Sequence, residues 1–238
     1  MFYTRYRFAR DFCREKEVLE IACGGGQGLG YLAKPAARVT GIDIDTKVLE
    51  YPAKLYAGRT NISVAPGDAC ALSFPDNSFD IIVLFDSVYW LKDQDLFMRE
   101  CRRVLRKGGR LIISTVNPQW SEFNPSPYAT TYLDARGLLK LYADSGFVCE
   151  ICGAFPCSEA GLKEKVITAI RKVAIKTRAI PVSIKGKEIL KRIFYGRIRQ
   201  IPAEVYDGMG DYSTPVTITA SLDNPPYKIL FAVGTVSK

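Results

Sequence analysis

Three acidic side chains stand where successive strand-like segments of this sequence end, and a cluster of glycines accompanies the first of them. Glu20 lies inside an apolar run, four residues before Gly24, while Asp43 ends the next run and Asp68 follows a third. A glycine cluster after a strand lets a ligand approach the backbone at the carboxyl edge of a sheet. A carboxylate beside that cluster repels a pyrophosphate and attracts a cation. The spacing therefore predicts a site for a positively charged ligand.

A dinucleotide site is the competing interpretation of the same glycines. The fingerprint G-x-G-x-x-G requires glycine at positions 24, 26 and 29, but residue 29 is leucine. A weaker form at Gly28, Gly30 and Ala33 leaves the earlier glycines without a role. A nicotinamide-dependent reductase on a similar sheet is the main competing class of enzyme.

The residue types that are present restrict the chemistry. Histidine is absent, which removes Ser/His and Cys/His nucleophiles, histidine-bound metals and an imidazole base. Any acid–base work falls to Asp, Glu, Tyr or Lys. The seven cysteines are an odd, scattered set, which we expect to be reduced thiols. Cys149, Cys152 and Cys157 suggest zinc, but positions three apart in a strand face opposite sides and a closed structural site needs four ligands, so we expect no metal.

Strand-like and helix-like segments alternate between residues 17 and 153. The run from Phe79 to Phe85 is almost wholly apolar, as in a strand that is covered on both faces of a parallel sheet. Such alternation predicts right-handed crossovers and an α/β fold with a doubly wound, mostly parallel sheet. The predicted strands are residues 18–23, 38–43, 61–65, 79–85, 110–114, 147–154, 216–221 and 227–236, and the predicted helices between them include residues 95–105 and 134–144.

The first strand and its glycines also form a motif. The segment Glu20-Ile21-Ala22-Cys23-Gly24-Gly25-Gly26 follows the pattern [DE]-x-G-x-G-x-G, with Ala22 in place of the first glycine. Asp43, the triplet Gly67-Asp68-Ala69 and residues 74–80 and 104–109 complete the pattern. Residues 17–153 thereby resemble the class I S-adenosylmethionine-dependent methyltransferases, particularly the small-molecule group with a methyltransferase domain of the type 11 kind. The resemblance implies a Rossmann-like methyltransferase fold with a seven-stranded sheet and S-adenosylmethionine as cofactor.

The same resemblance implies a role for each residue of the motif. Glu20 and the glycines face the methionyl part of the cofactor, with its ammonium group. Asp43 accepts hydrogen bonds from both ribose hydroxyls, Ile44 packs on the adenine face, and Asp68 accepts from the adenine amino group. The complete predicted cofactor set is Glu20, Ala22, Gly24, Gly25, Gly26, Asp43, Ile44, Asp68, Ala69 and Phe85.

The residues after the fourth strand are candidates for the acceptor side of the reaction. Asp86 borders the transferred methyl group by resemblance, and it is either a general base for a poorly acidic hydroxyl or the cap of the next helix. In an in-line methyl transfer, alignment of the nucleophile supplies most of the catalysis, so a base is not always required. The predicted acceptor pocket is formed by Tyr89, Trp90, Tyr128 and Tyr132, although aromatic residues after strands also serve as core or rim.

Two further segments have alternative interpretations. Tyr3 and Tyr6 lie on an expected N-terminal helix, which is either a lid over the site or a packed terminal helix. Asn224-Pro225-Pro226-Tyr227 resembles the catalytic loop of enzymes that methylate amino groups. Such a loop must follow the fourth strand, where residues 86–90 already stand, so we predict that 224–227 is a turn.

The basic character of the chain belongs to one segment. The net charge is +8, and between Cys157 and Gln200 there are 12 Lys/Arg against 3 Glu, while the other residues hold 21 Lys/Arg against 22 Asp/Glu. We predict a methyltransferase core with an N-terminal helix at 1–153, a basic helical insertion at 154–226 and the last core strand at 227–238. The insertion is either a solvated face or an attractor for an anionic acceptor or an anionic membrane surface.

The sequence thus predicts an S-adenosylmethionine-dependent methyltransferase of a small or conjugated metabolite, with the hydroxyl of a sugar or polysaccharide precursor as the leading acceptor. The alternatives are a non-catalytic cofactor-binding relative that acts through its basic helices, or an RNA methyltransferase, although no recognisable RNA-binding module accompanies the charge. The longest apolar run is strand-sized and arginines interrupt the first residues, so we expect a cytoplasmic protein without a membrane span.

Overall fold

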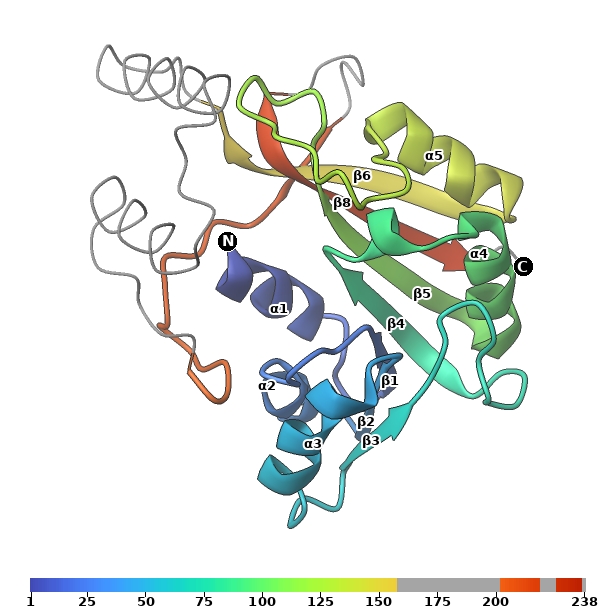
Figure 1. Cartoon of the computed structure of the whole chain (residues 1–238), viewed down its shortest axis with the longest axis vertical. Coiled ribbons are helices and arrows are strands. Elements are labelled where there is room, and N and C mark those ends of the chain that lie inside the picture. Colours follow the sequence, from blue (N-terminus) through green and yellow to red (C-terminus); the bar gives the residue numbers. More distant parts are fainter. Residues whose placement is uncertain (158–201, 219–225, 237–238) are drawn as a thin grey trace. The chain divides into compact units, whose positions relative to one another are not determined.

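The computed structural model describes residues 1–157, 202–218 and 226–236 (Figure 1). The chain divides into two compact units, Met1–Pro156 with Ala203–Lys238, and Cys157–Pro202. The predicted insertion spanned residues 154–226, whereas residues 154–156 end a strand of the first unit and residues 203–218 also belong to that unit. The basic residues at 163–199 and the dipeptide Asn224-Pro225 lie outside the described residues. The first unit holds the residues with predicted chemical roles.

Helices and strands alternate along the first unit. Its helices are α1 (Phe2–Arg10), α2 (Leu29–Ala33), α3 (Thr46–Leu55), the 3₁₀ helix η1 (Val88–Trp90), α4 (Gln94–Val104) and α5 (Ala135–Asp144). Its strands are β1 (Glu17–Ile21), β2 (Arg38–Asp43), β3 (Ile62–Pro66), β4 (Phe79–Phe85), β5 (Leu105–Val116), β6 (Phe147–Pro156), β7 (Val216–Thr217) and β8 (Tyr227–Val236).

The described strands form one sheet in the order β3-β2-β1-β4-β5-β8-β6-β7. Strands β1 to β5 run parallel to one another, and β8 enters antiparallel between β5 and β6. The doubly wound, mostly parallel α/β fold is therefore confirmed, but the sheet has eight strands rather than the seven expected. The additional strand is β7, a two-residue edge strand that pairs with Cys152 and Gly153 of β6.

Alternate residues of the central strands enter two hydrophobic layers. Val18 of β1 and Val83 of β4 pack in the layer that contains α1, α2 and α3, whereas Leu19 and Leu84 pack in the layer that contains α4 and α5. All four side chains are fully buried, and burying each stabilises the fold by roughly 1.5–3 kcal/mol relative to exposure. Figure 1 shows the two groups of helices on opposite faces of the sheet. This packing on both faces explains why β4 is apolar from Ile81 to Phe85.

Aspartates begin the three longest helices of the crossovers. The side chains of Asp45, Asp93 and Asp134 accept hydrogen bonds from backbone N–H groups of the first turn, at 2.8–2.9 Å. Each such cap contributes typically about 1 kcal/mol, because the first N–H groups of a helix have no partner within the helix. The caps fix where each connection leaves the carboxyl edge of the sheet and enters its helix.

Among the described residues, no helix combines the length and apolar character that crossing a membrane requires. In the same part of the chain, no three His, Cys, Asp or Glu side chains gather in a way that could hold a metal ion. The thiols of Cys149 and Cys152 are free.

Candidate functional site

Parallel pairing brings the predicted acidic residues to one edge of the sheet. Glu20 of β1 pairs in register with Gly41 of β2 and with Val83 of β4, so the strand ends that carry Glu20, Asp43 and Asp86 are neighbours. The order of the strands reverses between β1 and β4, since β2 and β3 lie on one side of β1 and β4 and β5 on the other. Ligands of doubly wound sheets bind at such a switch point, outside the carboxyl ends of the strands.

The glycine cluster contributes both an open backbone and a tight packing contact. Gly24 has a φ of +53°, and a Cβ atom placed on it meets no atom within 4 Å. Gly26 has a φ of +68°, but its Cβ would approach the Pro52 side chain of α3 to 2.5 Å. Gly26 is therefore required for packing, whereas the space above Gly24 is available to a ligand. Ala22 also has a positive φ, of 56°, in a region that glycine adopts more readily.

Asp43 links the second strand to this loop. One of its carboxylate oxygens, Oδ2, accepts a hydrogen bond from the Gly24 N–H at 2.9 Å, and Oδ1 accepts from the Asp45 N–H at 3.0 Å. A carboxylate has about four acceptor positions, so Asp43 retains capacity for donors from a ligand. The next residue, Ile44, is 74% exposed. The end of β2 thus offers a hydrogen-bond acceptor, the Asp43 carboxylate, next to an apolar surface, the Ile44 side chain.

Asp68 lies beside Asp43 through the connection after β3. The Gly67 N–H donates to the Asp43 carbonyl oxygen at 3.0 Å, which holds the two segments together. The Asp68 carboxylate is exposed and accepts from the Cys70 N–H at 2.8 Å. Ala69 follows it and is half-buried. The residues predicted from the first three strands are therefore brought to one edge.

Glu20 is a buried acid with one oxygen unsatisfied. Its residue is 2% exposed, the Tyr6 hydroxyl donates to Oε1 at 2.7 Å, and Oε2 has no partner among the described residues. Burial raises the pKa of Glu20 to about 8, although the hydrogen bond from Tyr6 lowers it. An unsatisfied buried oxygen costs free energy, which a cationic donor placed beside it would offset. Glu20 therefore fits a ligand that carries positive charge.

Helix α1 covers this edge. Of its residues that contact the edge, the sequence analysis named Tyr6 but not Arg5. The Tyr6 ring packs edge-on against Phe85 at 5.1 Å, and a Cβ on Gly28 would overlap that ring at 1.7 Å. Burial raises the pKa of the Tyr6 hydroxyl, and the charge of Glu20 raises it further. Tyr6 thus stands between Glu20, the end of β4 and the loop after β1.

Arg5 of the same helix was missed. Its residue is 6% exposed; Nε donates to the Ser114 hydroxyl at 3.2 Å and the guanidinium pairs with Asp86 at 2.5 Å. The signal in the sequence is an arginine among the aromatic residues of an otherwise buried helix face. Nothing in the sequence, however, indicates which acid it meets, because Asp86 lies more than 80 residues later.

The ion pair changes the interpretation of Asp86. The residue has a φ of 48° and its carboxylate is held by Arg5. The following 3₁₀ helix begins after Ser87 without a side-chain cap, so Asp86 does not serve as that cap. Its observed contact is with α1, which makes it an anchor for the covering helix.

Three of the four aromatic residues predicted to line the pocket of the methyl acceptor lie together, and the fourth does not. Tyr89 and Tyr132 stack at 4.8 Å between ring centroids, and Phe123 packs edge-on against Tyr132 at 4.7 Å. Trp90 contacts Tyr89 at 5.3 Å and is 47% exposed. Tyr128 stands apart, with 84% of its surface exposed. The loops after β4 and β5 therefore present an aromatic cluster, to which sequence reasoning did not assign Phe123.

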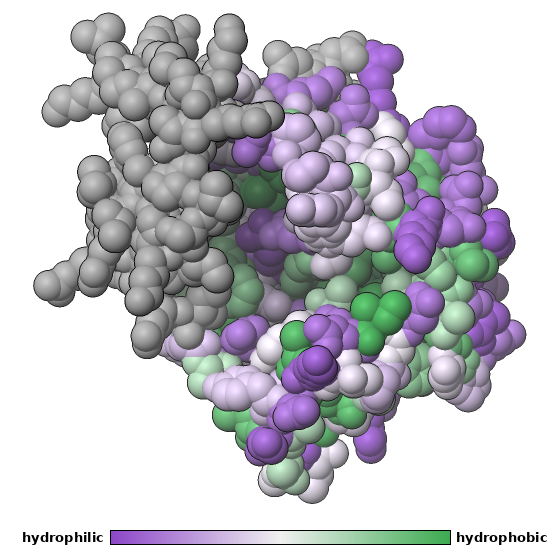
Figure 2. Space-filling model, in the orientation of Figure 1, coloured by the Kyte–Doolittle hydropathy of each residue, from purple (hydrophilic) through white to green (hydrophobic). Residues whose placement is uncertain are grey.

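Figure 2 shows that the described surface is hollowed near α1 and the end of β4, between the loop after β5 and the segments after β1 and β2. Hydrophilic and hydrophobic side chains both line this hollow. The hollow lies on the carboxyl side of the sheet, where the acidic residues and the aromatic cluster are also found. One edge of the sheet thus combines the open backbone of Gly24, the buried acid Glu20, the exposed carboxylate of Asp68 and an aromatic surface.

Comparison with known proteins agrees with this arrangement. Residues 19–113 match the family model described as a methyltransferase domain. A probable S-adenosylmethionine-dependent methyltransferase of Mycobacterium tuberculosis is 35% identical over 150 residues, which are 60% of this chain and 53% of that protein. A fatty-acid O-methyltransferase of Mycolicibacterium smegmatis is 33% identical over 107 residues, 44% of this chain and 39% of that protein.

A solved structure shares this fold. The YcgJ protein from Bacillus subtilis superimposes with a TM-score of 0.62 at 17% identity and covers 98% of both chains. At this identity the likeness concerns the fold alone. The chain spans about half the length of the mycobacterial relative and less of the fatty-acid enzyme. Residues 19–113 are thus similar to a methyltransferase domain, the relatives that match are named S-adenosylmethionine-dependent methyltransferases, and the sheet order agrees with that fold.

Proposed function

We propose that the protein transfers a methyl group from S-adenosylmethionine to a small or conjugated metabolite. The observation that carries the proposal is Glu20, whose unsatisfied buried oxygen lies on the strand that leads to the open backbone of Gly24. This arrangement suits a ligand that is cationic and needs close backbone approach. A nicotinamide dinucleotide places a pyrophosphate at the same loop. That negative charge further disfavours the ionised form of Glu20, whereas a cationic ligand beside Glu20 favours it.

The residues at this edge fit the parts of the proposed donor. Glu20 is suited to its ammonium group, Asp43 to the ribose hydroxyls, and Ile44 with Asp68 to the adenine ring and its amino group. When bound, the donor supplies a methyl group on a positively charged sulfur. The protein fixes the direction from which an acceptor approaches, and such alignment lowers a barrier by roughly 7–11 kcal/mol when it is complete.

The acceptor side favours a molecule with an apolar or planar part. The stacked pair Tyr89 and Tyr132, with Phe123 and Trp90 beside it, offers contact area of that kind. The fatty-acid O-methyltransferase named above acts, by its name, on an acceptor with an apolar chain. A sugar ring also packs on aromatic side chains, so a sugar hydroxyl is a second acceptor to be tested. The basic segment that suggested an anionic sugar conjugate lies outside the described residues.

No dedicated base is assigned to the reaction. The Arg5 guanidinium holds the Asp86 carboxylate, and a proton acceptor must be within hydrogen-bond reach of the acceptor's hydroxyl. A carboxylate or phenolate acceptor is already a nucleophile and requires no base. The proposed chemistry therefore rests on positioning by α1, the glycine loop and the aromatic cluster.

The decisive experiment follows the methyl group. The purified protein is incubated with methyl-labelled S-adenosylmethionine and, separately, with fatty acids, quinols, nucleotide-sugars, lipids and RNA. We expect label in one of the small-molecule or lipid fractions. Donor binding without label in any fraction would instead support the non-catalytic relative, and label in RNA alone would support the RNA methyltransferase.

A substitution tests the donor site directly. Asp43→Ala removes the proposed ribose acceptor and the contact with the Gly24 N–H, so we expect donor affinity to fall at least about tenfold by calorimetry. Asp45→Ala is the matched control, because it removes a neighbouring carboxylate that caps α3. The control should retain donor affinity within about threefold. Equal affinity of Asp43→Ala and the unmodified protein would contradict the proposed ribose contact.

A further inference from the structure

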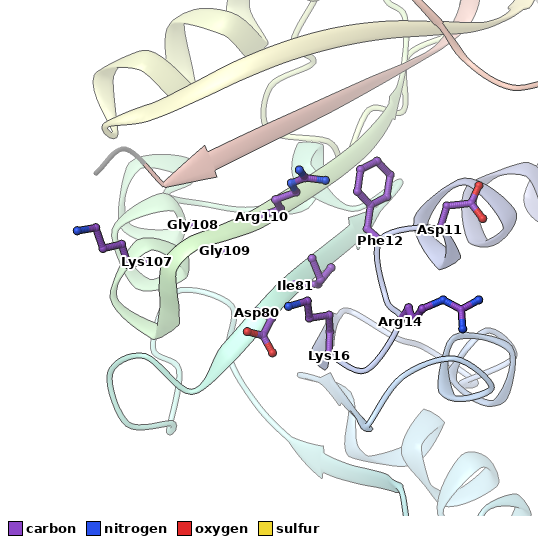
Figure 3. A pocket seen from close by; sticks show the side chains of 10 residues that line it. All are labelled: Asp11, Phe12, Arg14, Lys16, Asp80, Ile81, Lys107, Gly108, Gly109 and Arg110. Atoms are coloured by element: carbon purple, nitrogen blue, oxygen red, sulfur yellow. The ribbon is translucent and has the colours of Figure 1, made fainter.

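A second pocket lies at the opposite edge of the sheet, among the amino ends of the parallel strands. It has a volume of about 520 Å³ and is formed by the segment after α1, the start of β4 and the turn within β5. Figure 3 shows its ring of side chains: Arg110 and Phe12 on one side, Lys16 and Asp80 on the other, and Lys107 and Arg14 toward the two ends. Ile81 lies in the middle of the ring. None of these residues belongs to the donor or acceptor site.

The cations of this ring lack partners of their own. Among the described residues, the side chains of Arg14, Lys16 and Lys107 make no ion pair or hydrogen bond, and all three are exposed. The Arg110 guanidinium lies 5.1 Å from the centroid of the Phe12 ring, a contact that leaves its charge uncompensated. Four positive side chains therefore surround one pocket.

The two acids of the ring are already neutralised from outside it. Asp11 pairs with Arg7 at 2.5 Å, and Asp80 pairs with Arg106 at 2.8 Å. The Asp80 carboxylate also accepts from the Glu17 N–H at 2.9 Å. Glu15 and Glu17 alternate with the basic residues along the chain, but neither lines the pocket. The pocket is thus positive although the described part of the chain is nearly balanced in charge.

A neighbouring hollow extends this basic surface. It has a volume of about 280 Å³ and shares Asp11 and Arg14 with the first pocket. Arg7 and Arg10 line it, each paired with an aspartate. The shared wall makes one continuous basic region along the end of α1 and the linker to β1.

We propose that this pocket binds a phosphoryl group of an organic phosphate that carries at least two negative charges. The four cations supply charge-assisted hydrogen bonds, and Ile81 with the Phe12 ring supplies an apolar wall for the rest of the ligand. Its volume falls within the range of sites for small ligands, which is about 300–1,000 Å³. The phosphoryl group comes either from a soluble metabolite or from a lipid headgroup, and the test separates these sources.

The test uses pyrophosphate as the probe and a charge-matched pair of variants. Lys16→Gln/Lys107→Gln removes two exposed cations of the ring. Lys54→Gln/Lys92→Gln removes two exposed lysines elsewhere on the first unit and changes the net charge equally. Neither pair breaks a contact among the described residues, and thermal melting confirms that both variants are folded. Binding is measured by calorimetry, and co-flotation with vesicles that contain phosphatidic acid, a lipid with a phosphomonoester headgroup, is measured in parallel.

We expect saturable pyrophosphate binding that weakens about tenfold in the pocket variant and less than about twofold in the control. Vesicle binding that the pocket variant loses, and that pyrophosphate competes away, would assign the phosphoryl group to a lipid. Absence of both saturable pyrophosphate binding and variant-dependent vesicle binding would overturn the proposal. Equal weakening in the two variants would overturn it as well, because net charge alone would then explain the effect. The test does not depend on methyl transfer.

Discussion

At the scale of single residues, the main feature is an acid that the fold keeps away from water. Glu20 is almost fully buried and has one hydrogen-bond donor, the Tyr6 hydroxyl. Because its pKa in the folded chain is about 8, against an ordinary value of 4.5, the folded protein retains this proton at neutral pH. The unfolded chain releases the same proton near its ordinary pKa. Burial of Glu20 therefore lowers the free energy of unfolding by an amount that depends on pH.

The sign of that cost gives a prediction. Between about pH 4.5 and 8 the unfolded chain has lost the proton and the folded chain has not, so Glu20 lowers the free energy of unfolding as pH rises. The slope is at most about 1.4 kcal/mol per pH unit. Glu20→Gln should flatten the decline in stability between pH 5 and 8, measured by denaturant unfolding. Glu50→Gln, on the exposed surface of α3, should leave the slope unchanged. An unaltered slope in Glu20→Gln would contradict the assignment.

The positions of most residues in the proposed donor site follow from the sequence. Glu20, Gly24, Asp43 and Asp68 are predictable because the carboxyl ends of parallel strands meet at one edge, whatever the intervening helices are. The motif does not itself say why it has glycine where this chain has Ala22. The structure gives the reason, because the φ of 56° at this position is one that glycine adopts more readily. The partners of Glu20 and Asp86 were not predictable, because both come from a helix whose docking position has no periodic signal.

At the scale of elements, α1 is attached to the candidate site by three polar contacts and one tight packing contact. Arg5 reaches Asp86 and Ser114, and Tyr6 reaches Glu20 while its ring covers Gly28. These contacts join α1 to the ends of β1, β4 and β5. The helix therefore fixes the position of the glycine loop after β1 relative to the loop that leads to the aromatic cluster.

The packing contact allows a matched pair of glycine substitutions. Gly28→Ala places a methyl group inside the Tyr6 ring, so α1 must shift, and we expect a loss of roughly 1–3 kcal/mol in the free energy of unfolding. Gly58→Ala is the control, because a Cβ there meets nothing within 4 Å. Thermal or denaturant melting measures both variants. In a Tyr6→Ala background, the further loss caused by Gly28→Ala should be smaller than in the unmodified protein; an equal loss in both backgrounds would mean that the ring is not the cause.

At the scale of the whole sheet, the boundaries of the strands were predictable from the sequence. The order in which the strands pair was predictable only in part. The boundaries of β4, α4 and β6 agree with the periodic patterns within about two residues. The family resemblance implied seven strands, although residues 216–221 were also predicted as a strand, and β7 occupies Val216–Thr217 at the start of that run. Hydrophobic periodicity also carries no information on which strands pair, so the place of β8 between β5 and β6 required the structure.

The two edges of the sheet provide a prediction about independence. The proposed donor site lies at the carboxyl ends of the parallel strands and the basic pocket at their amino ends, with no side chain in common. Substitutions that share no partner usually act within about 0.3–0.5 kcal/mol of additivity. Lys16→Gln/Lys107→Gln should therefore leave donor affinity unchanged within about twofold by calorimetry. Asp43→Ala should likewise leave pyrophosphate binding unchanged, and a larger effect in either direction would reveal coupling between the edges.

The position of β8 has a consequence for biosynthesis. This strand fills the middle of one half of the sheet, yet the ribosome makes it after β5, β6 and the whole unit at 157–202. Until it emerges, the nascent chain holds β5 and β6 with open edges that other chains can pair with. A translation pause before residue 227 should therefore lengthen the time during which chaperones capture the chain.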